Sequence, residues 1–127
     1  MVMPRTAYFF FLFGLCALPC AAETVLLDFS SASCLPCRKM RPVVEQIKRA
    51  GYQVREISID RQAQIADRYG VTRVPTFIVV SDQRVMSRLT GKTTYRQLKE
   101  MLDRGHSQAA ANAASANQPS TAAPVVT

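Results

Sequence analysis

The chain has 127 residues, enough for one domain with short extensions, and 48% of them are hydrophobic, enough for a packed core. The formal charge of +7 raises the question of a nucleic-acid or anionic membrane partner. The basic residues between Arg38 and Arg104 contain no run of five or more, and no aromatic-plus-basic RNA motif accompanies them. We therefore expect a folded domain with scattered surface arginines and no nucleic-acid partner.

Residues 1–22 have the pattern of an export signal. Arg5 gives a positive start, Ala7–Leu18 is an apolar run of 12 residues, and Cys20-Ala21-Ala22 is a small-residue cleavage site. A helix that crosses a bilayer needs about 20 apolar residues, so this run is short for an anchor. We expect a cleaved signal peptide and an exported protein, in a bacterial periplasm; an uncleaved membrane anchor is the alternative.

Residues 23–29 are predicted to form the first strand. Residues 25–29 are apolar except for Asp28, and a nearly continuous apolar run is typical of a strand covered on both faces. A carboxylate in a buried strand is unfavourable unless it is partnered or neutral. Asp28 therefore either faces solvent at the strand end or lies beneath the cysteines that follow, where it can exchange a proton with Cys37.

Cleavage after Ala22 would leave Cys34 and Cys37 as the cysteines of the mature chain. They follow a strand and a short loop and open a helical pattern, so Cys34 lies where unpaired backbone N–H groups and the helix dipole favour a thiolate. Cys37 is close enough to attack a mixed disulfide formed on Cys34. A structural disulfide across so small a loop removes little entropy from the unfolded chain, so the pair favours a redox role.

Hydrophobic periodicity predicts the remaining elements. The helix after the cysteines carries an apolar stripe and an internal Pro42, which we expect to kink it. Later strands are expected at 52–59, 77–80 and 84–89, a short helix at 61–69, and a last helix at 95–102 that begins with a Thr94–Gln97 capping box. The order β-α-β-α-β-β-α predicts an α/β fold with parallel pairing and one antiparallel edge hairpin.

The composition changes after Arg104. Residues 105–127 contain no charged and few large side chains, which predicts a disordered tail beyond a domain of residues 23–104. The alternative is an alanine-rich helix through Gln108–Ala116, which Asn112 and Ser115 weaken.

From Val25 to Leu102 the chain resembles the thioredoxin family. The matching motifs are Asp28-Phe29, Cys34-Leu35-Pro36-Cys37, Pro42, Asp60, Tyr69-Gly70-Val71, Val74-Pro75-Thr76 and Gly91. The resemblance implies a thioredoxin-like fold with a mixed four-stranded sheet flanked by helices. It also implies catalytic roles for Cys34, Cys37, Asp28 and Pro75, with Asp28 as the buried acid below Cys37.

The same resemblance implies how a client protein is held. Pro75 would be cis and lie against the cysteine pair, and the Val74 backbone would pair with an extended client segment. Thr76 and Gly91 would complete this binding groove. Leu35 and Pro36 would contact the client and set how oxidising the pair is.

Several positions depart from the family pattern. Ser33 stands where a tryptophan usually precedes the first cysteine, Ser30 stands at a second position that is often aromatic, and Leu35 replaces a glycine. Glu56 takes the place of a lysine near the buried acid. Two carboxylates close together would raise the pKa of one of them.

These features predict a protein thiol–disulfide oxidoreductase that needs no cofactor and no metal, and that exchanges disulfides with client proteins and with an electron-donor or acceptor protein. Pro36 stands where strong oxidants carry histidine, and the only histidine, His106, is distant, so we expect a reductase with a potential nearer about −270 mV than about −120 mV. A redox-inactive client-binding module is the alternative. A metal carrier is a third hypothesis, but two cysteines fill only half of a tetrahedral site.

Overall fold

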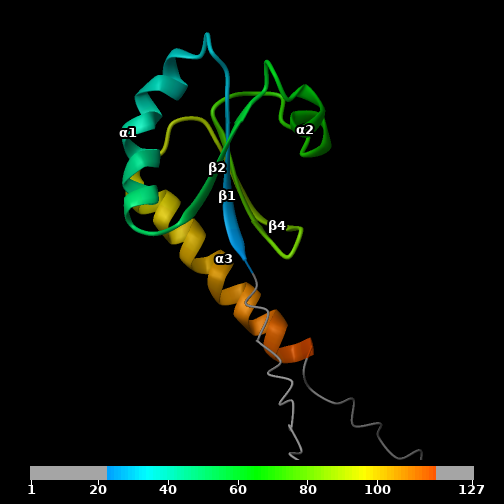
Figure 1. Cartoon of the computed structure of the whole chain (residues 1–127). Helices are drawn as coiled ribbons and strands as arrows, with labels where there is room; N and C mark the ends of the chain where they lie inside the picture. Colours follow the sequence, from blue (N-terminus) through cyan, green and yellow to red (C-terminus); the bar gives the residue numbers. More distant parts are fainter. Residues whose placement is uncertain (1–22, 117–127) are drawn as a thin grey trace, which may run out of the picture.

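The computed structural model of the chain describes residues 23–116 and contains a four-stranded sheet with three helices (Figure 1). Residues 1–22, where the export signal is expected, lie outside the described part. The elements in chain order are β1 (Thr24–Ser30), α1 (Leu35–Arg49), β2 (Gln53–Ser58), α2 (Ala63–Arg68), β3 (Thr76–Ser81), β4 (Arg84–Thr90) and α3 (Tyr95–Ala116). The predicted order of elements is confirmed, with ends that differ by at most two residues except at the C-terminus of α3.

The sheet has the strand order β2-β1-β3-β4. β1 and β2 are parallel, as expected, whereas β3 is antiparallel to both β1 and β4. The expectation of parallel pairing was therefore wrong for β3. Helix α2 has six residues and spans about 9 Å, whereas a six-residue strand spans about 20 Å, so α2 does not run the length of the sheet as the helix of a parallel crossover does. β3 begins at the end of the sheet where β2 ends and runs in the opposite direction.

The helices cover both faces of the sheet, α1 and α3 on one and α2 on the other (Figure 1). Leu26 of β1 belongs to the cluster with α1 and α3, and its neighbours Leu27 and Phe29 belong to the cluster with α2. This explains the continuous apolar run of β1, since alternate side chains enter different cores. By the same alternation Asp28 points toward α1, the helix that carries the cysteines.

Helix α3 continues to Ala116, so residues 105–116 are helical, and the expectation of a disordered tail from residue 105 was wrong for this part. The alternative of a helix through 108–116 is what the structure shows. The helix packs because its small residues allow a close approach: Gly105 and Ala109 are buried against the sheet. Residues 117–127 lie outside the described part, and the boundary expected at residue 104 falls inside α3.

The N-terminus of α3 has the predicted capping box. The backbone N–H of Gln97 donates to Thr94 Oγ1 at 3.3 Å, and the backbone N–H of Thr94 donates to Gln97 Oε1 at 3.2 Å. Of the helices in residues 23–116, none has the length and apolar character that a membrane crossing requires.

Candidate active site

Cys34 and Cys37 lie at the start of α1 and are joined by a disulfide. Cys34 is the N-cap residue, and its Sγ accepts a hydrogen bond from the backbone N–H of Cys37 at 3.1 Å. Cys34 is half-buried while Cys37 is only 8% exposed. In the reduced protein the same N–H and the helix dipole would stabilise a Cys34 thiolate, so the more exposed of the two cysteines is also the activated one.

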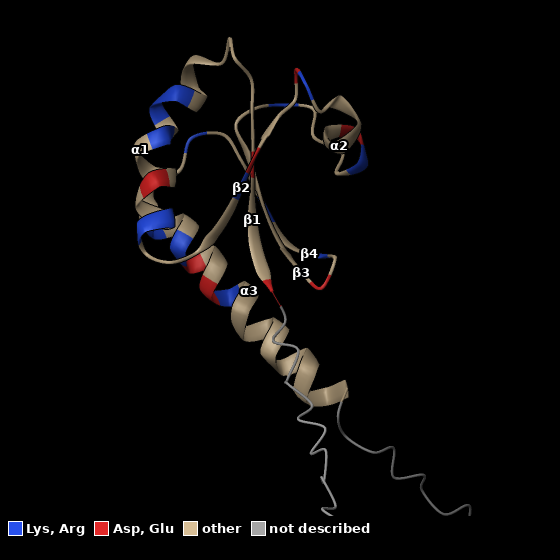
Figure 2. Cartoon of the chain, in the orientation of Figure 1, with Lys and Arg blue, Asp and Glu red and all other residues tan. Residues whose placement is uncertain are grey.

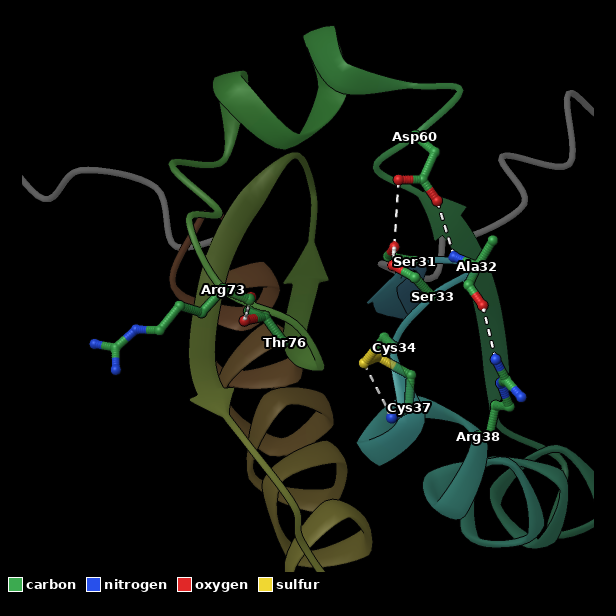
Figure 3. The surroundings of a disulfide bond; sticks show 9 residues. All are labelled: Ser31, Ala32, Ser33, Cys34, Cys37, Arg38, Asp60, Arg73 and Thr76. Atoms are coloured by element: carbon green, nitrogen blue, oxygen red, sulfur yellow. Dashed lines mark hydrogen bonds between the residues drawn. A yellow bond between two sulfur atoms is a disulfide. The ribbon is translucent and has the colours of Figure 1, made fainter.

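The loop that presents Cys34 is held by the carboxylate of Asp60 (Figure 3). The carboxylate accepts hydrogen bonds from the Ala32 backbone N–H at 2.8 Å and from Ser31 Oγ at 3.3 Å. On the other side, Arg38 Nη2 donates to the Ala32 carbonyl at 3.3 Å. The sequence analysis named Asp60 only as part of a family motif and gave it no structural role. A hydrogen bond between a side chain and a backbone N–H 28 residues away produces no repeating pattern in the sequence.

Asp28 lies near Cys37, and the two residues line one cavity of about 630 Å³. Burial, then the nearby Glu56 carboxylate, raises the pKa of Asp28 from 3.8 to about 6, against the opposite effect of Lys48. Glu56 is the register partner of Asp28 in the parallel pair of β1 and β2. A pKa raised by a second carboxylate was expected, but desolvation is the larger cause.

Lys48 was missed by the sequence reasoning. It comes from the last turn of α1, and its Nζ lies 2.5 Å from Glu56 Oε1 and 2.9 Å from Glu45 Oε1. These bonds raise the pKa of Lys48, so it stays a cation. Lys48 therefore balances the charge of Glu56 beside Asp28, a contact between α1 and β2 that only the tertiary fold creates.

The residues before β3 face the disulfide from the other side of the site (Figure 3). The Val74–Pro75 peptide bond is cis, as the resemblance implied. The backbone N–H of Gly91 donates to the Pro75 carbonyl at 2.8 Å, which joins the loop before α3 to this segment. Thr76 is 2% exposed and its hydroxyl donates to the Arg73 carbonyl at 2.6 Å, so any client contact of Thr76 would use its backbone.

Leu35 and Pro36 occupy the first two positions of α1, and both are exposed. Leu35 is 59% exposed, which makes it an apolar side chain directly beside Cys34 that faces solvent. Proline is accommodated here because the first helical N–H groups have no intrahelical partner. The described residues, 23–116, contain no group of three or more histidine, cysteine or carboxylate side chains that is arranged to hold a metal ion.

A disulfide between cysteines separated by two residues, at the start of a helix and opposite a cis-proline, defines the class of thiol–disulfide oxidoreductases. The comparisons identify the family. The sequence model of the thioredoxin family matches residues 17–104, so the chain belongs to the thioredoxin family.

Individual relatives agree with this assignment. Thioredoxin from Alicyclobacillus acidocaldarius is 32% identical over 83 residues, covering 63% of this chain and 79% of the relative. Thioredoxin from Bacillus subtilis is 30% identical over 91 residues, covering 66% of this chain and 88% of the relative. The structure of a mutant thioredoxin from Halobacterium salinarum superposes with a TM-score of 0.61 at 30% identity, covering 64% of this chain and 73% of that one.

Proposed function

We propose that this protein reduces disulfide bonds in client proteins outside the cytoplasm, with Cys34 as the attacking thiol and Cys37 as the resolving thiol. The observation that carries the proposal is the unequal setting of the two sulfurs. Cys34 is partly exposed and accepts a helix N–H, whereas Cys37 is buried behind it. The Cys34 sulfur can therefore contact a client disulfide, and the Cys37 sulfur is placed to attack the mixed disulfide that forms.

The reaction has two exchange steps. The Cys34 thiolate attacks one sulfur of the client disulfide, forms a mixed disulfide and releases the other client sulfur as a thiolate. Cys37 then loses its proton and attacks Cys34 Sγ, which releases the second client thiolate and leaves the Cys34–Cys37 disulfide. Two electrons have passed to the client, and a dithiol protein must return two electrons before the next cycle.

Asp28 is proposed to accept the proton of Cys37 in the second step. It lines the same cavity as Cys37, and its pKa of about 6 makes it a stronger base than an ordinary aspartate, though still ionised for the most part at pH 7. The cavity also gives solvent access, so the proton can leave once Cys37 has reacted.

The client would lie in extended form along the Val74–Pro75 segment and contact the exposed Leu35 and Pro36. Backbone pairing to Val74 would supply affinity without demanding a particular client sequence. Thr76 and Gly91 are proposed to shape this groove through their backbone rather than their side chains, since the Thr76 hydroxyl is bonded to Arg73.

Export and direction are parts of the same proposal. We propose that residues 1–22 are a cleaved signal peptide and that the mature domain begins at residue 23. Pro36 ahead of Cys37 gives no imidazolium to stabilise a thiolate, so we expect a reductase with a potential nearer about −270 mV than about −120 mV. An electron-donor protein at the membrane or in the same compartment is then required.

Reduction of insulin disulfides by the mature protein tests the proposal. Wild type should be active with a dithiol donor, Cys34→Ser should be inactive, and Cys37→Ser should accumulate mixed disulfides that a non-reducing gel resolves. Activity retained in Cys34→Ser would refute the assignment of the attacking thiol. A glutathione redox titration measures the potential, and a value near that of the strong oxidants would refute the proposed direction.

A further inference from the structure

Six exposed basic residues lie on the segments of the chain that flank the disulfide. Arg38, Arg41 and Arg61 line the cavity that also contains Cys37. Arg73 directly precedes Val74, and Lys92 directly follows Gly91, the residue bonded to the Pro75 carbonyl. The sixth is Lys39 on α1, and all six are exposed. We call this set the basic rim.

Within residues 23–116, none of the basic rim forms an ion pair. The ion pairs of this part of the chain join Lys48 to Glu45 and Glu56, Lys99 to Asp103, and Arg104 to Glu100. Three carboxylates lie close to the rim, and each is engaged elsewhere or partly buried. Asp60 holds the Ser31–Ala32 loop, Glu56 is bound by Lys48, and Asp28 is half-buried.

The residues of the basic rim near the start of α1 do not stabilise this helix. The first turn of α1 contains no acidic residue, and Arg38 and Lys39 lie at the end of the helix where the dipole is positive. Cations are unfavourable there and favourable at the other end, where Lys48 and Arg49 stand. Figure 2 shows the contrast along the chain: blue residues gather on α1, while the last part of α3 carries no charge.

We propose that the basic rim binds an acidic surface of a partner protein, with carboxylates that flank the partner's reactive cysteine. This inference rests on the proposed function, because three residues of the rim line the cavity that contains the resolving Cys37. The exposed Leu35 beside Cys34 and the cavity beside Cys37 give this surface an apolar part and a concave part. A partner protein can bring a disulfide to Cys34, whereas nucleic acids and lipids contain no disulfide.

Charge complementarity of this kind acts mainly on the association rate and is weakened by salt. The test uses three disulfide peptides with one core sequence, flanked by glutamate, lysine or glutamine. The second-order rate constant for their reduction by the reduced protein is measured in low and high salt. We expect the glutamate peptide to react at least about tenfold faster than the lysine peptide in low salt, with a ratio near one at about 0.5 M salt.

Two double variants with the same change in net charge locate the effect. Arg41→Glu with Arg61→Glu changes the rim, and should abolish the difference in rate between the glutamate peptide and the lysine peptide. Arg49→Glu with Arg68→Glu changes exposed arginines away from the rim, and should keep the preference.

The outcomes separate this inference from the proposed function. If none of the three peptides is reduced, the proposed function fails. If all are reduced at equal rates, or if both double variants lose the preference equally, only the basic rim proposal is refuted. Inhibition of glutamine-peptide reduction by anionic phospholipid vesicles, with no preference among peptides, would assign the rim to a membrane surface and also refute it.

Discussion

Replacement of Asp28 by asparagine should stabilise the oxidised protein at neutral pH and leave its stability nearly unchanged in acid. Burial and Glu56 raise the pKa of Asp28 to about 6 in the folded protein, whereas in the unfolded chain it has the ordinary value near 3.8. The folded state thus binds the proton more tightly than the unfolded state. The free energy of unfolding therefore falls as the pH rises from 3.8 to 6 and is constant, as far as Asp28 is concerned, above that range.

The magnitude follows from the two pKa values. At about 1.36 kcal/mol per pH unit, the difference between 6 and 3.8 corresponds to about 3 kcal/mol, an upper value because Asp28 retains some solvent contact through the cavity. The Asp28→Asn variant is neutral at every pH and similar in shape. It should gain this free energy relative to wild type at pH 8 and almost none of it below pH 4.

Urea unfolding of the oxidised protein between pH 3.5 and 8 measures the effect. The matched control is Asp67→Asn on α2, which makes the same replacement at an exposed aspartate outside the cavity. A stability gain in Asp28→Asn that is equal at pH 4 and pH 8 would refute the reasoning, because it would show that ionisation of Asp28 is not the source. The same variant should slow the second exchange step, which a higher yield of trapped mixed disulfide would report.

Three other replacements test contacts of the structure. Glu56→Gln removes a carboxylate that raises the pKa of Asp28, so the midpoint of the pH dependence of stability should fall below 6; an unchanged midpoint would contradict the pairing. Asp60→Ala leaves the Ala32 N–H without its acceptor, so amide hydrogen exchange should accelerate there and stability should fall by about 1–2 kcal/mol; unchanged exchange at Ala32 would contradict a stabilising role for this hydrogen bond. In Gly105→Ala the new Cβ would lie 2.7 Å from Val79 Cγ1, so urea unfolding should show a net loss of about 1–2 kcal/mol despite the better helix propensity of alanine, whereas a gain would mean that α3 shifts freely.

The sequence predicted correctly those elements that depend on residues close together in the chain. The helix that begins at the cysteines, the capping box of Thr94 and Gln97, and the strand buried on both faces each follow from spacing within a few residues. The direction of β3 did not follow, because an apolar run has the same pattern in either direction, and the direction is seen only in the pairing of β3 with β1 in the folded sheet.

The contacts that sequence reasoning missed join distant parts of the chain. Lys48 meets Glu56 only when α1 lies against β2, and Asp60 meets Ala32 only when the loop after β2 lies beside the loop before α1. The length of α3 was underestimated for a related reason. Gly105 lacks a large side chain, yet its smallness is what lets the helix approach Val79.

The N-cap position of Cys34 has a consequence for the chain before it folds. The N–H of Cys37 that contacts Cys34 Sγ is aimed at it only by the first turn of α1. In the unfolded chain the Cys34 thiol should therefore keep an ordinary pKa near 8.5 and be mostly protonated at neutral pH. The thiol that becomes the nucleophile is therefore weakly reactive in the unfolded chain, and formation of α1 is the step that activates it.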